Sequence, residues 1–149
     1  MKQADTKKIT TDFFKLLESL NDKQWELKVN KEWSVKNVVA HLVGWEYESS
    51  YQLAISWEKK KKPWFLETDD YYTFNRVSLN RFGKLPPQEL LAEWKKWQQT
   101  LEEEIKDIGE GKLRAQPELF SWVFDEGSDN HYLHHYKQIQ KILINQSTK

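Results

Sequence analysis

The sequence predicts an all-α protein: a four-helix bundle with one extra short helix. Apolar residues recur at helical spacing in four long stretches. We find no alternation of apolar and polar residues that would indicate a strand, and no Asn-Gly turn of the kind that joins hairpins. The five glycines and four prolines are few for 149 residues, and most fall between the helical stretches. We therefore expect one domain over residues 1–149, which is long enough to bury a core.

The first two helices follow from their apolar spacing and their ends. Residues 5–20 form the first expected helix, whose apolar positions are Ile9, Phe13, Leu16, Leu17 and Leu20. Asn21 and Asp22 are expected to end it. Ser34 is a good N-cap, and we expect a long helix over residues 35–60 to follow it. The apolar stripe of that helix is Val35, Val38, Val39, Leu42, Trp45 and Leu53.

Prolines and glycines separate the next two helices. A break at residues 61–64 precedes a shorter helix over residues 69–82, which Gly83 ends. The two prolines at residues 86–87 open another long helix, because proline is tolerated in a first helical turn, and Gly109 ends it. Its expected buried residues are Leu90, Leu91, Trp94, Trp97, Leu101 and Ile105.

A long connection of about 17 residues follows this helix and leads to the last one. Ser128 or Asp129 is its expected N-cap, and it runs to about Asn145. Its buried sector is defined by Tyr132, Tyr136, Ile139, Ile142 and Leu143.

Composition excludes several classes of function. Lys plus Arg and Asp plus Glu both number 23, so the net charge is zero, without the basic surplus typical of nucleic-acid binding. There is no cysteine, which excludes disulfides, thiolate metal sites and a cysteine nucleophile. No stretch has the roughly 18 to 20 apolar residues of a membrane span. The start of the chain is polar and carries no secretory signal, so we expect a cytoplasmic protein without membrane contact.

The four histidines suggest a metal site. His131 and His135 are spaced i,i+4 in the last helix, so their side chains lie on neighbouring parts of one face. His134 falls on the outer side of that helix and is not expected to be a ligand. His41 lies at the edge of the apolar stripe of the second long helix, on the side of Trp45. The three remaining histidines are a candidate metal site, and hydrogen-bonded residues at helix edges are the alternative.

Several segments resemble the DinB-like (YfiT-like) superfamily. The segment EWSVKNVVAHLVGWE, residues 32–46, is similar to its second-helix signature, and HYLHH at residues 131–135 is similar to its closing histidine pair. FNR at residues 74–76 and PPQELL at residues 86–91 resemble the branch that includes ClbS/DfsB-type proteins and the amino-terminal domains of mycothiol-dependent maleylpyruvate isomerases. The resemblance covers nearly the whole chain.

The resemblance implies a four-helix bundle of the DinB/YfiT type, a homodimer, and a divalent metal bound by one histidine of the second helix and two of the last. These positions correspond to His41, His131 and His135. Neutral imidazoles suit nickel or zinc. Some members resemble transferases or isomerases that use a low-molecular-weight thiol such as bacillithiol, mycothiol or glutathione, and ClbS-like members are hydrolases.

Further residues are candidates for chemistry or substrate binding. Glu46, on the apolar face of the second helix, is a candidate general acid or base, and an acid at the helix edge paired with Lys or Arg is the plainer explanation. Trp45 and Trp57 are candidates to line one pocket mouth, with Trp64 and Phe65 in the break as a lid, and ordinary core packing is the alternative for each of them. Asn75 and Arg76 are candidates to bind an anionic substrate group, or else cap and pair within the bundle.

Three functions remain open at this point. The first is a metal-dependent enzyme acting on a small molecule, either a thiol-dependent S-transferase or isomerase or a hydrolase. The second is a protein that binds or sequesters a small molecule without turnover. The third is a structural dimer in which the histidines have no ligand.

Overall fold

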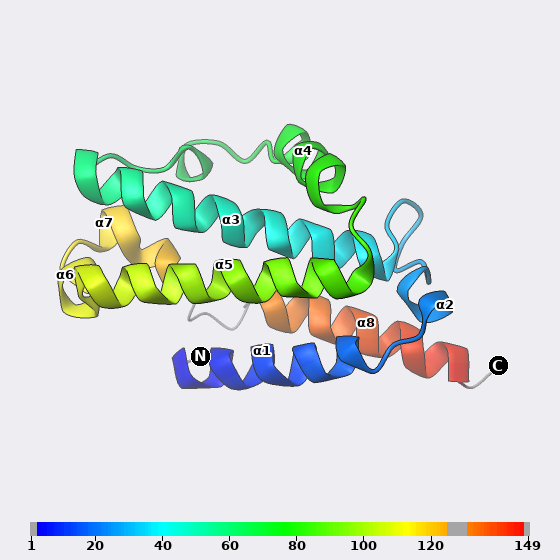
Figure 1. Ribbon diagram of the computed structural model, residues 1–149. Helices are drawn as coiled ribbons and strands as arrows, with labels where there is room; N and C mark the ends of the chain where they lie inside the picture. Colours follow the sequence, from blue (N-terminus) through cyan, green and yellow to red (C-terminus); the bar gives the residue numbers. More distant parts are fainter. Residues whose placement is uncertain (1–2, 125–130, 148–149) are drawn as a thin grey trace. The chain divides into compact units, whose positions relative to one another are not determined.

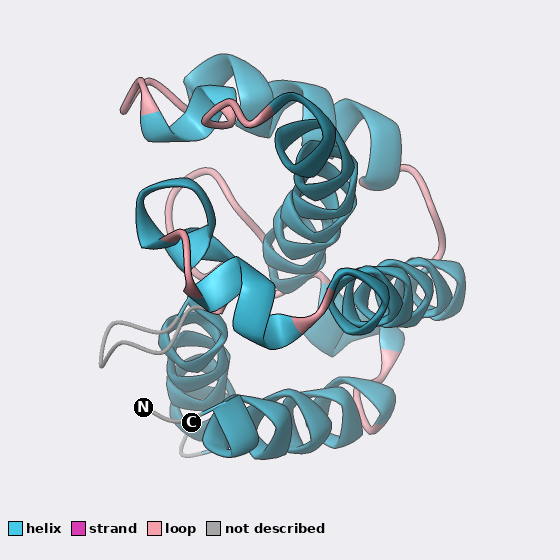
Figure 2. Cartoon of the chain, turned by 90° about the vertical axis from the view of Figure 1, so that its left-hand side faces the viewer, coloured by secondary structure: helices cyan, strands magenta, loops and turns pink. Residues whose placement is uncertain are grey.

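The structure is a computed structural model that describes residues 3–124 and 131–147, and it confirms the all-α class (Figure 1). Helices joined by loops make up this part of the chain, which has no strand and only an isolated bridge between Lys28 and Ser34 (Figure 2). The four long helices are α1 (Gln3–Glu18), α3 (Val35–Lys59), α5 (Pro87–Ile108) and α8 (His131–Ser147). None of the described helices is long and apolar enough to cross a membrane.

The start of α3 is set by the predicted cap. The Ser34 hydroxyl accepts a hydrogen bond from the Asn37 backbone N–H, with 3.2 Å between nitrogen and oxygen. In return the Asn37 side-chain oxygen accepts from the Ser34 backbone N–H at 2.9 Å. Two backbone donors of the first turn are thus satisfied reciprocally, as in a capping box. The N-cap expected for α8, at Ser128 or Asp129, lies outside the described residues.

The structure differs from expectation in the shorter elements. Asn21 does not simply end α1, because its side chain caps a further turn, α2 (Asp22–Trp25). The break after α3 contains a 3-10 turn, η1 (Trp64–Leu66), and α4 (Tyr72–Phe82) begins three residues later than predicted. The long connection after α5 is itself partly helical, with α6 (Glu110–Arg114), α7 (Pro117–Phe120) and η2 (Ser121–Val123). Short turns of this kind lack the long apolar period from which the other helices were predicted.

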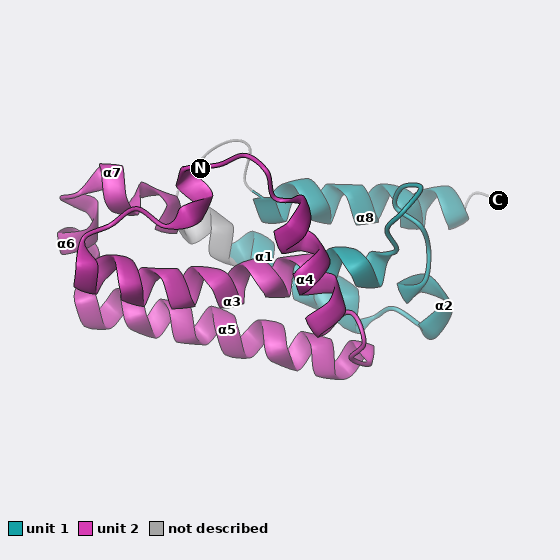
Figure 3. Cartoon of the chain, turned by 90° about the horizontal axis from the view of Figure 1, so that it is seen from above, with its two compact units in different colours: residues 1–39, 125–149 teal, residues 40–124 magenta. Residues whose placement is uncertain are grey.

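The chain divides into two compact units, residues 1–39 with 125–149 and residues 40–124 (Figure 3). In the first unit, α1 and α8 pack along each other and run in the same direction (Figure 1). Phe13 of α1 stacks on Tyr136 of α8, with ring centroids 5.2 Å apart. Ile139, one turn after Tyr136, is fully buried, which confirms the predicted inner face of α8.

In the second unit, α3 and α5 run side by side (Figures 1 and 3). The Ser50 hydroxyl of α3 donates a hydrogen bond to the Glu104 carboxylate of α5, and Tyr47 meets Trp97 edge to face at 4.7 Å. The predicted inner face of α5 is buried at Leu90, Leu91 and Trp94 and half-buried at Trp97, Leu101 and Ile105. A separate core cluster consists of Leu53, Leu113, Phe120 and Phe124.

The segment of residues 60–71 runs back along α3, so that α4 comes to lie beside the first half of that helix (Figure 1). Gly44 permits this approach. A Cβ atom at this position would overlap the side chain of Ser78 in α4. The glycine therefore allows α4 to pack closely against the turn of α3 that follows His41.

Candidate metal centre

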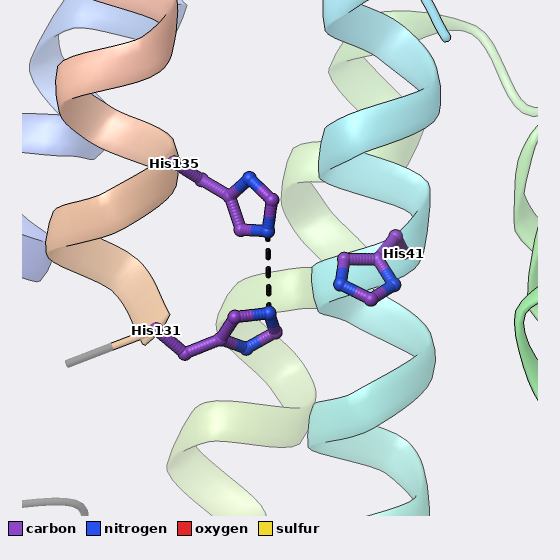
Figure 4. Close-up of side chains that lie close together, drawn as sticks. All are labelled: His41, His131 and His135. Carbon is purple, nitrogen blue, oxygen red and sulfur yellow. Dashed lines mark hydrogen bonds between the residues drawn. The ribbon is translucent and has the colours of Figure 1, made fainter. Parts of the chain in front are cut away.

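Two histidines of α8 form the centre of the candidate site. The side chains of His131 and His135 point toward each other, with 3.2 Å between their Nε2 atoms (Figure 4). His131 is half-buried and His135 is 7% exposed, whereas His134 is exposed. This order of burial agrees with the helical-wheel prediction, which placed His135 innermost, His131 at the edge and His134 on the outer side.

The spacing of the pair suits a bound metal ion. Imidazole nitrogens lie about 2.0–2.1 Å from zinc, and a tetrahedral angle then separates two ligand nitrogens by about 3.3 Å. The 3.2 Å between the Nε2 atoms is close to this value. The distance between the two Nε2 atoms is therefore that of two ligands of one ion.

The protonation of His135 also suits a ligand. Its Nδ1 lies 3.0 Å from the side-chain oxygen of Gln138, one turn further along α8. An amide oxygen only accepts, so Nδ1 carries the hydrogen and Nε2 has the lone pair. Burial lowers the pKa of His135, an effect that the Gln138 hydrogen bond opposes and nearby His134 reinforces. A lowered pKa favours the neutral imidazole that a metal requires.

His41, which lies in the second unit, has an Nδ1 contact of the same kind as that of His135. It projects from α3 and is 7% exposed (Figure 4). Its Nδ1 lies 3.0 Å from the side-chain oxygen of Asn75 in α4. By the same reasoning Nδ1 donates the hydrogen bond, and Nε2 is the nitrogen with the lone pair.

Asn75 and Arg76, predicted to act together on a substrate, lie on different sides of α4. Asn75 is half-buried and bonded to His41. Arg76 is exposed, and its guanidinium lies 5.8 Å from the ring centroid of Tyr72. Successive helical residues differ by about 100° around the axis, which explains the divergence. Arg76 is therefore the more accessible of the two to a ligand from solvent.

The expected aromatic residues belong to two separate groups. Trp45 is half-buried and packs with Phe74 at 4.3 Å and with Trp64 at 6.0 Å between centroids. Trp64 is held in place by a hydrogen bond from its indole N–H to Glu48, 2.9 Å long. Trp57 instead packs against Phe120, with the Lys60 ammonium over its ring. Trp45 and Trp57 are about 18 Å apart along the axis of α3, so they contact different neighbours.

Glu46 is buried, with 4% exposure, as expected for an acid on the apolar face. At about 100° per residue it projects roughly 140° around α3 from His41, and thus not from the same side.

Ser50, one turn after Glu46, bonds to Glu104 of α5. Burial raises the pKa of Glu104, and the Ser50 hydrogen bond partly opposes this rise.

Sequence reasoning did not identify Gln138 or Glu104. Gln138 follows His135 by three residues, a spacing that places two side chains together on a helix, so this partner was detectable. Glu104 carried no such signal, since its partner Ser50 is 54 residues away in the chain.

One comparison with known proteins gave a match. A family model for the DinB superfamily matches residues 6–139, a range that includes all four histidines. A search of curated proteins and a search of solved structures both found no match.

Proposed function

Because the chain belongs to the DinB superfamily, we propose that His41, His131 and His135 bind one divalent transition-metal ion, which serves a reaction on a small molecule. The observation that carries the proposal is the His131–His135 pair, whose Nε2 atoms have the spacing of two ligands on one ion. The Nδ1 hydrogen bonds of His135 and His41 support it, since each assigns the lone pair to Nε2.

The donor set favours nickel or zinc. Imidazole nitrogens suit both ions, and the chain has no cysteine to provide a softer ligand. Three protein ligands leave a coordination position for water or a thiol, whose pKa a bound metal lowers. With the lone pair on His135 Nε2, the hydrogen between the two Nε2 atoms is donated by His131 Nε2. To act as a ligand through Nε2, His131 has to hold its proton at Nδ1 instead.

The proposed reaction is a thiol-dependent S-transfer or isomerisation with an exogenous low-molecular-weight thiol, or a hydrolysis. Trp45 is the proposed contact for an apolar or conjugated substrate because its ring is half-buried among other aromatic rings. Arg76 is the proposed contact for an anionic group because its guanidinium is exposed. Glu46, the one carboxylate buried in the described part of the chain, is the proposed proton-transfer group, although it projects from a different side of α3 than His41 does. We further propose a cytoplasmic homodimer of the ClbS/DfsB-related branch.

Metal analysis of tag-free protein tests the ligand set. We expect about one nickel or zinc per chain in the wild type, and loss of that metal in His131→Ala and in His41→Ala, because a two-ligand site is much weaker. His134→Ala is the matched control and should keep the metal, since His134 is exposed on the same helix. Metal-free wild type that also fails to take up added nickel or zinc would contradict the proposal.

The second candidate is a protein that binds or sequesters a small molecule without turnover. The aromatic group of Trp45, Trp64 and Phe74 favours it, because such rings bind conjugated molecules without a metal. Tryptophan fluorescence of metal-free protein during titration with a conjugated probe such as 8-anilinonaphthalene-1-sulfonate distinguishes the two. Saturable quenching that is lost in Trp45→Leu, with no metal uptake, favours sequestration.

A further inference from the structure

The segment of α3 that carries His41 is held against α4 at three places, all inside the second unit. Asn75 bonds to His41 at 3.0 Å between Oδ1 and Nδ1. Phe74 packs on Trp45, with ring centroids 4.3 Å apart. Ser78 occupies the space that Gly44 leaves open. Because contacts on both neighbouring turns hold the two helices together, the position of the Asn75 amide relative to the His41 ring is well defined.

The direction of the hydrogen bond determines which imidazole nitrogen can bind a metal. An amide oxygen has no hydrogen to give, so the His41 Nδ1 must donate to it. A neutral imidazole has one hydrogen, and placing it on Nδ1 leaves the lone pair on Nε2. His41 is 7% exposed, so few water molecules compete for the Asn75 oxygen. The amide therefore selects one tautomer before any metal arrives.

We propose that Asn75 is a positioning residue: its amide oxygen holds the His41 proton at Nδ1 and thereby presents Nε2 as the metal-binding nitrogen. This role as an outer partner of a metal ligand rests on the proposed metal site, and it differs from the substrate contact that the sequence suggested. Partners of this kind fix ring orientation and typically change metal affinity about 10- to 100-fold.

The tautomer is measured in metal-free protein by nitrogen NMR of labelled histidine side chains. In the wild type we expect the His41 hydrogen on Nδ1. In Asn75→Leu, which keeps a similar volume but has no acceptor, this preference should be lost. Asn75→Asp keeps an acceptor oxygen and should restore it. Asn80→Leu, at an exposed position of the same helix, is the matched control and should leave the His41 signals unchanged.

Zinc affinity, measured by competition with a chelator, gives the second readout. Asn75→Leu should bind zinc about 10- to 100-fold more weakly than the wild type, while Asn75→Asp and Asn80→Leu stay within a few-fold. A wild-type His41 with its hydrogen on Nε2, or a tautomer unaffected by Asn75→Leu, would overturn the proposal. The wild-type spectrum provides this test even if Asn75→Leu does not fold. Wild type that binds no zinc but shows the expected tautomers would overturn the metal site and leave the Asn75–His41 relationship intact.

Discussion

The Nδ1 atom of His135 donates a hydrogen bond to the side-chain oxygen of Gln138, with 3.0 Å between the two atoms. The same His135 presents its Nε2 to the Nε2 of His131 at 3.2 Å. One face of α8 thus provides a candidate ligand together with the group that fixes its tautomer. His41 and Asn75 repeat this arrangement across two helices of the second unit.

Replacing Gln138 tests the arrangement within α8. Gln138→Leu removes the acceptor of the His135 Nδ1 hydrogen, so we expect zinc affinity to fall about 10-fold or more without loss of helix content. Chelator competition and circular dichroism measure the two effects. Gln140→Leu, at an exposed position of α8, serves as the control. Equal zinc affinity in the Gln138 variant and the wild type would show that the partner of His135 is unimportant.

Neutralising Glu46 tests its proposed role in proton transfer. Since Glu46 is not a proposed ligand, we expect Glu46→Gln to keep its metal. Hydrolysis of p-nitrophenyl acetate by the zinc-loaded protein should fall about 100-fold or more, because general acid–base groups contribute on that scale. Metal analysis and the rate of nitrophenolate release check the two expectations. Unchanged hydrolysis at full metal content would assign Glu46 a purely structural role.

Glu104 is expected to make stability depend on pH. Its pKa in the folded protein is raised above the ordinary 4.5, mainly by burial, so the folded state binds this proton more tightly than the unfolded chain does. The stabilisation from protonation is complete below about pH 4.5 and is lost as the pH rises through the folded pKa. Glu104→Gln keeps an acceptor for Ser50 and should therefore be more stable than the wild type at pH 7, with the difference shrinking toward pH 4.5.

Urea denaturation at several pH values measures the effect of Glu104. Glu102→Gln, at an exposed position of the same helix, is the control and should not reproduce the trend. A Glu104→Gln variant that is less stable than the wild type at every pH would show that the ionised carboxylate is favourable in the folded protein.

The contact between α3 and α4 depends on Gly44. Gly44→Ala places a methyl group inside the Ser78 side chain, so we expect a loss of about 1–3 kcal/mol in the free energy of unfolding, typical of overpacking. Gly111→Ala is the matched control, since no atom lies within 4 Å of the added methyl group there. Alanine is the better helix former, so this control should gain up to about 1 kcal/mol. Urea denaturation compares the two, and equal effects would mean that α4 moves away at little cost.

The sequence by itself determined what depends on local periodicity. The four long helices, the Ser34 cap and the inner face of α8 were predictable because helical hydrogen bonds and caps join residues three or four apart. The facing pair His131 and His135, and the outward position of His134, follow from the same period. Recognition of the family also came from short ordered segments of sequence, and the match over residues 6–139 confirms it.

Only the tertiary structure decided which residues of different helices meet. Asn75 was a candidate for substrate binding, and the structure shows it bonded to His41, 34 residues earlier in the chain. The pairing of Gly44 with Ser78 and of Ser50 with Glu104 was equally invisible. Helical period fixes the side of its own helix from which a residue projects. Which helix faces that side depends on loop paths and on the packing of the whole unit, and neither is a property of any short segment.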